Sequence, residues 1–266
     1  MSFSPDWLAL REPADHRARD AGLLARLSEW AAARDSVTVL DLGCGTGSNA
    51  RAMIPHLGNT QHWRLVDYDG GLLNIAREKL AAESAHRLYA MTVKTEQADL
   101  SGGIGPLLAE GCDLVTASAL FDLMSREWLD GMVAELAARR LPFYTVLIYD
   151  GLMSWDPPHP ADEAIGRAFN THQQSDKGFG PAAGPEAGSY LAAKLRGAGF
   201  DVMTAPSPWR LGPSDEPLLA DNAIGVANAA RETGQIAEAA LAEWTALRRQ
   251  GGSCTIGHID ILALPH

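Results

Sequence analysis

Residues 39–48 read Val39-Leu40-Asp41-Leu42-Gly43-Cys44-Gly45-Thr46-Gly47-Ser48, and this stretch decides the fold. The apolar run at 37–43 is typical of a buried parallel strand. Three glycines at alternate positions then favour a turn whose backbone can approach a ligand closely, ahead of a helix N-terminus that favours polar or negative groups. A tight strand-to-helix turn that binds nothing could carry the same glycines, so its surroundings must decide between the two interpretations.

Strands and helices alternate after this turn. The pattern predicts an α/β fold with a doubly wound, mainly parallel sheet covered by helices on both faces. Beyond the first strand, we expect strands at 64–69, 87–100, 112–120 and 143–150 and helices at 70–83 and 125–140, the latter with Ser125 as N-cap.

The flanking segments differ in character. Residues 1–35 predict an N-terminal helical segment before a main domain at 36–266. Residues 151–184 are rich in Pro, Gly and polar side chains and predict a long irregular insertion. The remaining pattern predicts a helix at 185–199, a strand at 200–211, two helices within 214–250 and a closing strand at 253–265.

Three acids follow three successive strands. Asp41 precedes the glycines, Asp67 ends the second strand and Asp99 ends the third. The carboxyl ends of parallel strands meet at one crevice, where open α/β sheets bind ligands. The glycine spacing is GxGxG rather than the dinucleotide fingerprint GxGxxG, and Asp41 suits an ammonium group better than a pyrophosphate. The sequence therefore predicts a cationic nucleoside as the ligand.

VLDLGCGTG, VDYD, ADL and DLVTASAL together resemble the cofactor half of the class I S-adenosylmethionine-dependent methyltransferases, over about residues 35–150. The resemblance implies a seven-stranded sheet whose last strand is antiparallel, with helical cap insertions here at about 151–184 and 214–250. It implies S-adenosylmethionine as cofactor and S-adenosylhomocysteine as product. By position, the glycine turn would surround the methionine moiety, Asp67 would hold the ribose, and Tyr68, Asp99 and Leu100 would bind the adenine. The implied cofactor site comprises Asp41, Gly43, Cys44, Gly45, Gly47, Asp67, Tyr68, Asp99, Leu100 and Ser118.

The methyl acceptor is less well defined by the sequence. A formal net charge of −11 opposes binding to nucleic acid, whose affinity comes largely from cations, and leaves a small molecule as the expected acceptor. His172 in the insertion is the candidate general base, although it could equally be a solvated loop residue. Arg17 and Arg19 could clamp a carboxylate or form a solvated helix face, and His258 is expected to be a core or edge residue. The candidate acceptor-binding residues are Asp122, Trp155, Gln173, Asp176 and Lys177.

Enzymatic methyl transfer is the leading function. A non-catalytic module that binds the same cofactor could keep all three acids, and a nicotinamide-dependent oxidoreductase is disfavoured by Asp41 and the glycine spacing. The separated cysteines Cys44, Cys112 and Cys254 predict no metal site. The N-terminal residues carry early acids and no long apolar run, so we expect a cytoplasmic protein without membrane contact. The oligomeric state stays open, with a homodimer as one option.

Overall fold

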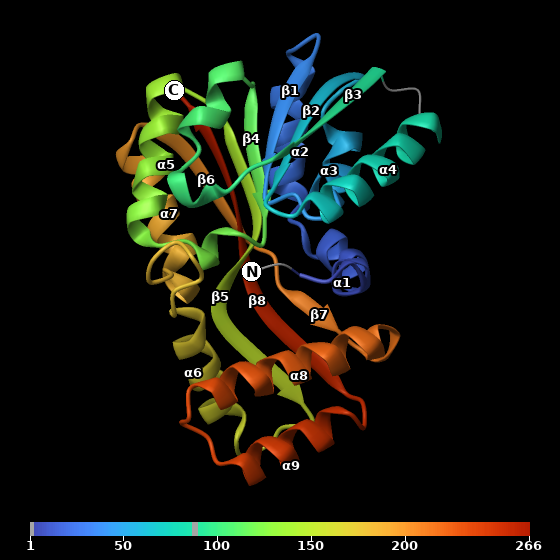
Figure 1. Ribbon diagram of the computed structural model, residues 1–266, viewed down its shortest axis with the longest axis vertical. Helices are drawn as coiled ribbons and strands as arrows, with labels where there is room; N and C mark the ends of the chain where they lie inside the picture. The colour runs from blue at the N-terminus through green and yellow to red at the C-terminus, as the bar shows by residue number, and fades with distance from the viewer. Residues whose placement is uncertain (1–2, 87–89) are drawn as a thin grey trace.

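A computed structural model of the chain describes residues 3–86 and 90–266. Its centre is a mixed sheet, within which the described residues form eight strands (Figure 1). The order is β3-β2-β1-β4-β5-β8-β6, and the short strand β7 pairs with β8 outside this path. The strands are β1 Val37–Leu42, β2 Thr60–Asp67, β3 Ala90–Gln97, β4 Leu114–Ser118, β5 Phe143–Asp156, β6 Phe200–Pro206, β7 Trp209–Leu211 and β8 Ser253–Pro265.

The sheet confirms the predicted doubly wound architecture. Strands β1 to β5 pair in parallel, and β8 runs antiparallel to both β5 and β6. The strand count differs from the expected seven because Trp209–Leu211 forms the extra strand β7, which pairs with the first residues of β8. The first three residues of the strand expected at 87–100 lie outside the described residues.

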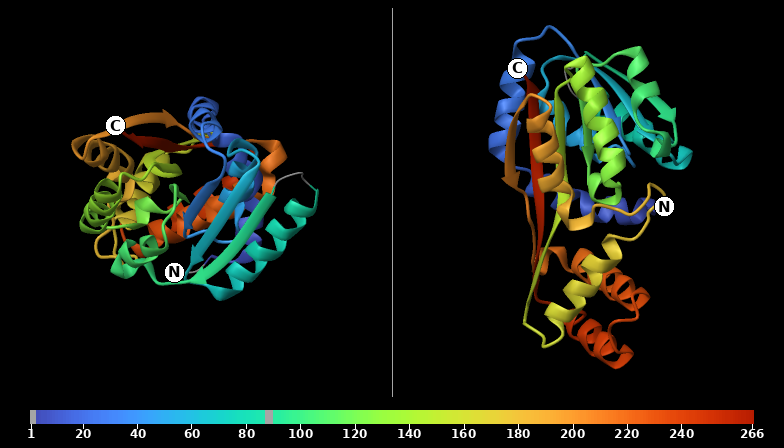
Figure 2. Two further views of the ribbon diagram at one scale, coloured as in Figure 1. Left: turned by 90° about the horizontal axis from the view of Figure 1, so that it is seen from above. Right: turned by 90° about the vertical axis from the view of Figure 1, so that its left-hand side faces the viewer.

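Helices cover both faces of the sheet (Figure 2). On one face, Leu27, Met53 and Leu80 share a buried apolar core with Trp63 of the sheet. On the other, Leu129 and Leu191 pack with Phe143. The helices are α1 Pro5–Ala18, α2 Ala21–Ala32, α3 Ser48–Met53, α4 Gly70–His86, α5 Arg126–Arg139, α6 Asp162–Gln173, α7 Ala187–Gly197, α8 Glu216–Glu232 and α9 Glu238–Arg248.

The N-terminal segment, expected to be helical, forms the two helices α1 and α2. Ser4 caps α1 by accepting a hydrogen bond from the Trp7 N–H at 3.2 Å. Helix α2 contributes Leu23 and Leu27 to the core that also contains Val39 of β1. The division into a segment at 1–35 and a domain at 36–266 stays a prediction.

The insertion at 151–184 is more regular than the sequence predicted. Residues up to Asp156 prolong β5, because Met153 to Asp156 find pairing partners in the first residues of β8. Helix α6 then follows, with Ile165 and Ala168 buried. Proline and glycine content alone could not reveal this pairing, since the partner strand lies about 100 residues further along the chain. Helices α6, α8 and α9 gather around the prolonged ends of β5 and β8, at the bottom of Figure 1.

One buried arginine is central to this lower group of helices. Arg248 of α9 is 2% exposed and lies over the rings of Trp155 and Trp244 at 5.2 and 5.1 Å from their centroids. Its Nη2 also donates to Asp162 Oδ1 at 2.5 Å, which joins α9 to the start of α6. The predicted acceptor-binding residue Trp155 is thus packed inside this group of helices.

Candidate cofactor and acceptor site

The glycine turn between β1 and α3 has the backbone conformation that its residues predicted. Gly43, Gly45 and Gly47 have φ angles of 60°, 54° and 78°, in the left-handed region that favours glycine. A Cβ on Gly43 would come within 3.0 Å of Leu120 Cδ1, and one on Gly45 within 3.2 Å of Leu8 Cδ1. The turn therefore needs glycine for its conformation and for the close approach of its neighbours.

A cavity of about 410 Å³ opens beside this turn, at the carboxyl ends of the parallel strands. Its volume lies within the range of small-molecule sites. Most of the predicted cofactor residues meet there, since the cavity is lined by Gly43, Cys44, Gly45, Asp67, Tyr68, Asp99, Leu100 and Ser118. These residues thus share one cavity, and their role in binding the cofactor stays a prediction.

Asp67 is the acid most directly tied to the turn. Its Oδ2 accepts a hydrogen bond from the Gly45 N–H at 2.8 Å, and its Oδ1 accepts one from the Asp69 N–H at 2.9 Å. A carboxylate offers about four acceptor positions, so both oxygens keep capacity for a diol. Asp69 instead serves α4, because its Oδ1 accepts from the Gly71 N–H at 2.8 Å and the Leu72 N–H at 3.3 Å.

The end of the cavity near β3 combines a flat aromatic surface with an acid. Tyr68 lines the cavity and is 66% exposed, so its ring is free to cover a ligand. Asp99 accepts a hydrogen bond from the Ser101 N–H at 2.8 Å, which lowers the pKa of its carboxyl group. Asp99 is therefore ionised at neutral pH and can accept further hydrogen bonds.

Asp41 takes a different position from the one its motif suggested. It is fully buried under the turn and does not line the cavity. Its Oδ1 accepts from Asn49 Nδ2 at 2.7 Å, and Asn49 Oδ1 accepts from Arg19 Nη2 at 3.0 Å. Desolvation raises the pKa of Asp41 to about 7. Asn49, the hydrogen-bond partner of Asp41, does line the cavity.

Helix α1 supplies cavity residues that the sequence analysis missed. Leu8, Arg11 and Asp15 all line the cavity. Arg11 Nε and Nη2 donate to the two Asp15 carboxylate oxygens at 2.8 and 3.1 Å, and Asp15 Oδ1 also accepts from Trp209 Nε1 at 3.0 Å. No sequence motif marks these residues, because α1 reaches the cavity only by packing back over the turn.

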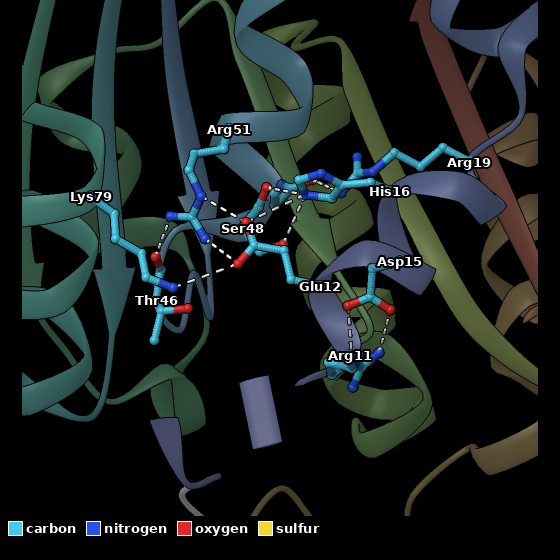
Figure 3. Close-up of polar contacts among 10 residues, drawn as sticks. Arg11, Glu12, Asp15, His16, Arg19, Thr46, Ser48, Arg51 and Lys79 are labelled. Atoms are coloured by element: carbon cyan, nitrogen blue, oxygen red, sulfur yellow. Dashed lines mark hydrogen bonds and ion pairs between the residues drawn. The ribbon is translucent and has the colours of Figure 1, made fainter. Parts of the chain in front are cut away.

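A polar network holds α1 against the glycine turn (Figure 3). Glu12 accepts from Arg51 Nε and Nη2 at 2.8 and 2.6 Å and lies 3.6 Å from Lys79 Nζ. Arg51 Nη1 also donates to the Thr46 carbonyl at 2.7 Å. His16 Nε2 lies 3.0 Å from Ser48 Oγ.

The two arginines considered as carboxylate clamps serve other contacts. Arg17 Nη2 donates to Asp215 Oδ1 at 2.6 Å, and Arg19 is buried against Asn49. Neither lines the cavity, whereas Arg11 on the preceding turns of α1 does. Among the described residues, the arginine that lines the cavity is therefore Arg11.

The insertion reaches the cavity through a short loop that follows α6. Lys177, Gly178 and Phe179 line the cavity, and of the predicted acceptor-binding residues Lys177 alone does so. Asp176 Oδ1 accepts from the Gly178 and Gly180 N–H groups at 2.7 and 3.1 Å, so this side chain shapes the loop.

His172 precedes this loop in the chain, at the end of α6. Its Nε2 is 2.9 Å from Glu232 Oε2 on α8, and its Nδ1 is 3.4 Å from Lys177 Nζ. Neither His172 nor Gln173 lines the cavity, because both belong to the last turn of α6. In this conformation His172 thus joins α6 to α8, and its role as a general base stays a prediction.

Asp122 is buried and does not line the cavity. Leu120 and Leu123 line the cavity on either side of it, while Asp122 itself is 8% exposed. Its Oδ1 has no hydrogen-bond partner among the described residues. Desolvation raises the pKa of Asp122 to about 6.

His258 is buried, as expected for a core histidine. Its ring lies against Trp209 and Tyr149, with centroids 5.4 and 6.3 Å apart. Burial, and then the charge of Arg11, lower the pKa of His258 to about 3, so the ring is neutral at physiological pH.

Comparisons with known proteins agree with this geometry. Residues 39–141 match the family model described as a methyltransferase domain. No curated protein sequence matches the chain. Within the described ranges, the helices are all too short or too polar to cross a membrane.

Solved structures share the fold at low sequence identity. A cyclopropane-fatty-acyl-phospholipid synthase-like protein from Lactobacillus casei is 16% identical with a TM-score of 0.54, over 99% of this chain and 95% of that one. The YcgJ protein from Bacillus subtilis is 14% identical with a TM-score of 0.51, over 93% and 99%. A cyclopropane synthase from Mycobacterium tuberculosis is 13% identical with a TM-score of 0.50, over 98% and 94%. These likenesses show a common fold.

The family match covers the part of the chain that carries the glycine turn and the acids at 67 and 99. It agrees with the family that the sequence resembles and with S-adenosylmethionine as the cofactor. The turn, the sheet order and the family match all point to one conclusion, that residues 39–141 carry a methyltransferase domain.

Proposed function

We propose that this protein transfers the methyl group of S-adenosylmethionine to a small-molecule acceptor. The observation that carries the proposal is the single cavity wall on which the glycine turn, Asp67, Tyr68 and Asp99 meet. A Cβ on Gly43 or Gly45 would crowd this wall, which supports close contact between backbone and ligand there. When bound, the cofactor supplies an electrophilic methyl group on a sulfonium centre.

The residues of the cavity suit the parts of this cofactor. Asp67 would accept hydrogen bonds from the ribose, and Tyr68 would cover the adenine beside Asp99 and Leu100. Arg11 is charged and is held in place by Asp15, so it would bind the cofactor carboxylate. The methionine moiety would then lie along the glycine turn toward Ser118.

Two features support a small acceptor. The chain has a net charge of −11, which opposes contact with a polyanion. The loop at 177–179, which belongs to the insertion, also lines the cavity. Such a loop would exclude water from the reacting groups, the usual role of a lid. Cytoplasmic location and the homodimer option stay predictions.

Turnover tests the proposal. Labelled S-adenosylmethionine is incubated with the protein and a metabolite extract, and both S-adenosylhomocysteine and labelled small products are measured. Accumulation of both, dependent on protein and extract, is the expected result. A protein that binds S-adenosylhomocysteine tightly but produces neither would be a non-catalytic binding module.

The choice of ligand distinguishes a methyltransferase from the remaining alternative, a nicotinamide-dependent oxidoreductase. At about 100 times its dissociation constant, a ligand stabilises the folded state by about 2.7 kcal/mol. We expect S-adenosylmethionine and S-adenosylhomocysteine to raise the Tm, and NAD and NADP to leave it unchanged. Tight NAD binding without any response to S-adenosylhomocysteine would contradict the proposal and favour an oxidoreductase.

A further inference from the structure

Lys177 brings a positive charge to the cavity, and the protein uses only part of its hydrogen-bonding capacity. The residue lines the cavity from the loop that follows α6. Its Nζ donates to Ser175 Oγ at 2.8 Å and to His172 Nδ1 at 3.4 Å. An ammonium group has three N–H donors, so one donor is left after these two contacts within the described residues. This third donor is the one that a ligand in the cavity would use.

The charge of Lys177 has no carboxylate in direct contact. The acid that acts on it is Glu232, but Glu232 Oε2 lies 2.9 Å from His172 Nε2. Within the described ranges, no carboxylate oxygen lies within 4.0 Å of Lys177 Nζ. Burial lowers the pKa of Lys177, and the charge of Glu232 offsets this only in part. The ammonium group therefore lacks a counter-charge, which an anionic ligand would supply.

The loop that carries Lys177 is fixed on both sides of this residue. It continues α6 on one side, and on the other Phe179 lies against Trp128 of α5, with ring centroids 6.2 Å apart in an edge-to-face arrangement. The Ala183 N–H donates to the Met124 carbonyl at 2.7 Å. The protein thus sets the position of the loop before a ligand binds, which reduces the ordering cost of binding.

The other charged side chains of the cavity already have partners. Arg11 pairs with Asp15, and both Asp67 and Asp99 accept hydrogen bonds from backbone N–H groups. Under the proposed function, Arg11 binds the cofactor carboxylate, and the acids at 67 and 99 bind its ribose and adenine. The cofactor carries no second negative group, so the charge of Lys177 is left for the acceptor.

We propose that the methyl acceptor carries an anionic oxygen group, a carboxylate or a phosphate, which Lys177 binds through a charge-assisted hydrogen bond. This inference rests on the proposed function and names the chemical class of its acceptor. Hydrogen bonds between an ammonium group and an oxyanion are about twice as strong as those between neutral groups. The bound group serves recognition, and methylation takes place at another atom, because an ammonium contact withdraws the electron density that an oxyanion needs as a nucleophile.

The surroundings of Lys177 make an anionic acceptor dependent on it. The chain has a net charge of −11, and Asp67 and Asp99 line the same cavity. An anionic group that enters is therefore repelled unless a cation lies beside it. Removal of the charge at position 177 should weaken acceptor binding, and an acid at this position should add repulsion.

The main test compares Lys177→Gln with Lys177→Glu, since these side chains are nearly equal in size and differ in charge. Labelled S-adenosylmethionine is supplied at saturation with dilute metabolite extract, so the rate reports kcat/KM for the acceptor. We expect Lys177→Gln to lower this rate about 10- to 150-fold, the range for a hydrogen bond to a charged group, and Lys177→Glu to lower it further. The affinity of Lys177→Gln for S-adenosylhomocysteine should stay within about twofold of wild type by calorimetry.

Lys194→Gln is the matched control. Lys194 is an exposed residue of α7 that pairs with Asp130 and does not line the cavity. Its replacement changes the net charge by the same amount, and the rate in dilute extract should equal that of wild type. In concentrated extract, Lys177→Gln should recover toward the wild-type rate, because excess acceptor offsets weaker binding but would not restore a lost kcat.

The labelled wild-type product reveals the anionic group. Coupling to an amine with a carbodiimide increases the mass of a product that has a carboxylate, and phosphatase decreases the mass of one that has a phosphate. We expect one of these two changes by mass spectrometry. Mild alkali should release no labelled methanol, because the oxyanion bound by Lys177 is not the methylated group and the product is no methyl ester.

Several results would overturn the inference. They are a wild-type rate for Lys177→Gln in dilute extract, equal rates for Lys177→Gln and Lys177→Glu, an equal loss in Lys194→Gln, weakened S-adenosylhomocysteine binding in Lys177→Gln, or a product that is a methyl ester or has neither anionic group. A wild-type protein without turnover would instead refute the proposed function, and this inference with it. The wild-type assay therefore separates the two failures.

Discussion

Arg51 donates two hydrogen bonds to Glu12, from Nε to Oε1 at 2.8 Å and from Nη2 to Oε2 at 2.6 Å. The pair joins α1 to α3, the helix that begins at the glycine turn, and both side chains are largely shielded from solvent. Through Nη1, the same arginine also holds the Thr46 carbonyl within the turn. The N-terminal helix is therefore connected directly to the backbone that forms the cofactor site.

We expect the Glu12–Arg51 pair to affect cofactor binding through α1. Glu12→Gln should weaken S-adenosylhomocysteine binding by about tenfold, equivalent to about 1.4 kcal/mol, because α1 carries Arg11 and Asp15 into the cavity. Calorimetry on both single variants and on the Glu12→Gln/Arg51→Gln double variant would measure this. A coupling free energy of about 0.5–3 kcal/mol is expected for residues in contact. Additive effects of the two changes would contradict the coupling.

Asp67 and Asp69 allow a matched comparison two residues apart. Asp67→Ala removes a carboxylate that would bind the ribose, worth about 1.5–3 kcal/mol, so affinity for S-adenosylhomocysteine should fall about 10- to 150-fold. Asp69→Ala removes the cap of α4 and should lower the Tm, by a stability loss of about 0.5–2 kcal/mol, with little change in affinity.

Asp67 also accepts a hydrogen bond from the Gly45 N–H, so a second variant at this position is needed to separate the two roles of its carboxylate. Asp67→Asn keeps one side-chain oxygen that can accept a hydrogen bond from the Gly45 N–H or from the ribose. Its affinity for S-adenosylhomocysteine should therefore lie between those of wild type and Asp67→Ala. Unchanged affinity in folded Asp67→Ala would mean that the carboxylate serves only the turn.

His172 can be tested as an anchor against its predicted role as a base. Its contact with Glu232 joins α6 to α8 just before the loop that lines the cavity. If the contact positions the loop, His172→Ala and Glu232→Ala should raise KM similarly and leave kcat nearly unchanged. A loss of about 10²- to 10⁴-fold in kcat for His172→Ala alone would instead identify His172 as the base.

Asp41 should make the folding stability pH-dependent. Its folded-state pKa of about 7 lies above the ordinary 3.8, so the ionised form is disfavoured in the fold. Its contribution to stability is present below about pH 4 and is lost as pH rises through 7. The difference corresponds to about 4 kcal/mol at most. Asp41→Asn, which keeps an oxygen for Asn49, should reduce the fall in Tm between pH 5 and 8. An identical pH dependence in both proteins would show that Asp41 titrates normally.

Much of the cofactor site followed from the sequence because its residues are close together along the chain. The three left-handed glycines, and the acids that end β2 and β3, depend on local turn chemistry and on the rule that parallel strands open on one edge. The Ser125 cap of α5 is likewise local, and the structure confirms it with a hydrogen bond from the Trp128 N–H at 3.2 Å. Short-range patterns of this kind can be recognised in the sequence alone.

The acceptor side did not follow from the sequence, since it depends on contacts between distant segments. Arg11 and Asp15 reach the cavity only because α1 folds back over the turn, and the regular insertion depends on pairing between β5 and β8. The polar stretch around His172 predicts a base, and only the packing of α6 against α8 shows that its ring lies beside Glu232. The sequence by itself determined the sheet and the cofactor end of the cavity, through periodicity and turn conformation. The tertiary structure decided which side chains from distant segments line the cavity, because long-range packing sets their burial and direction.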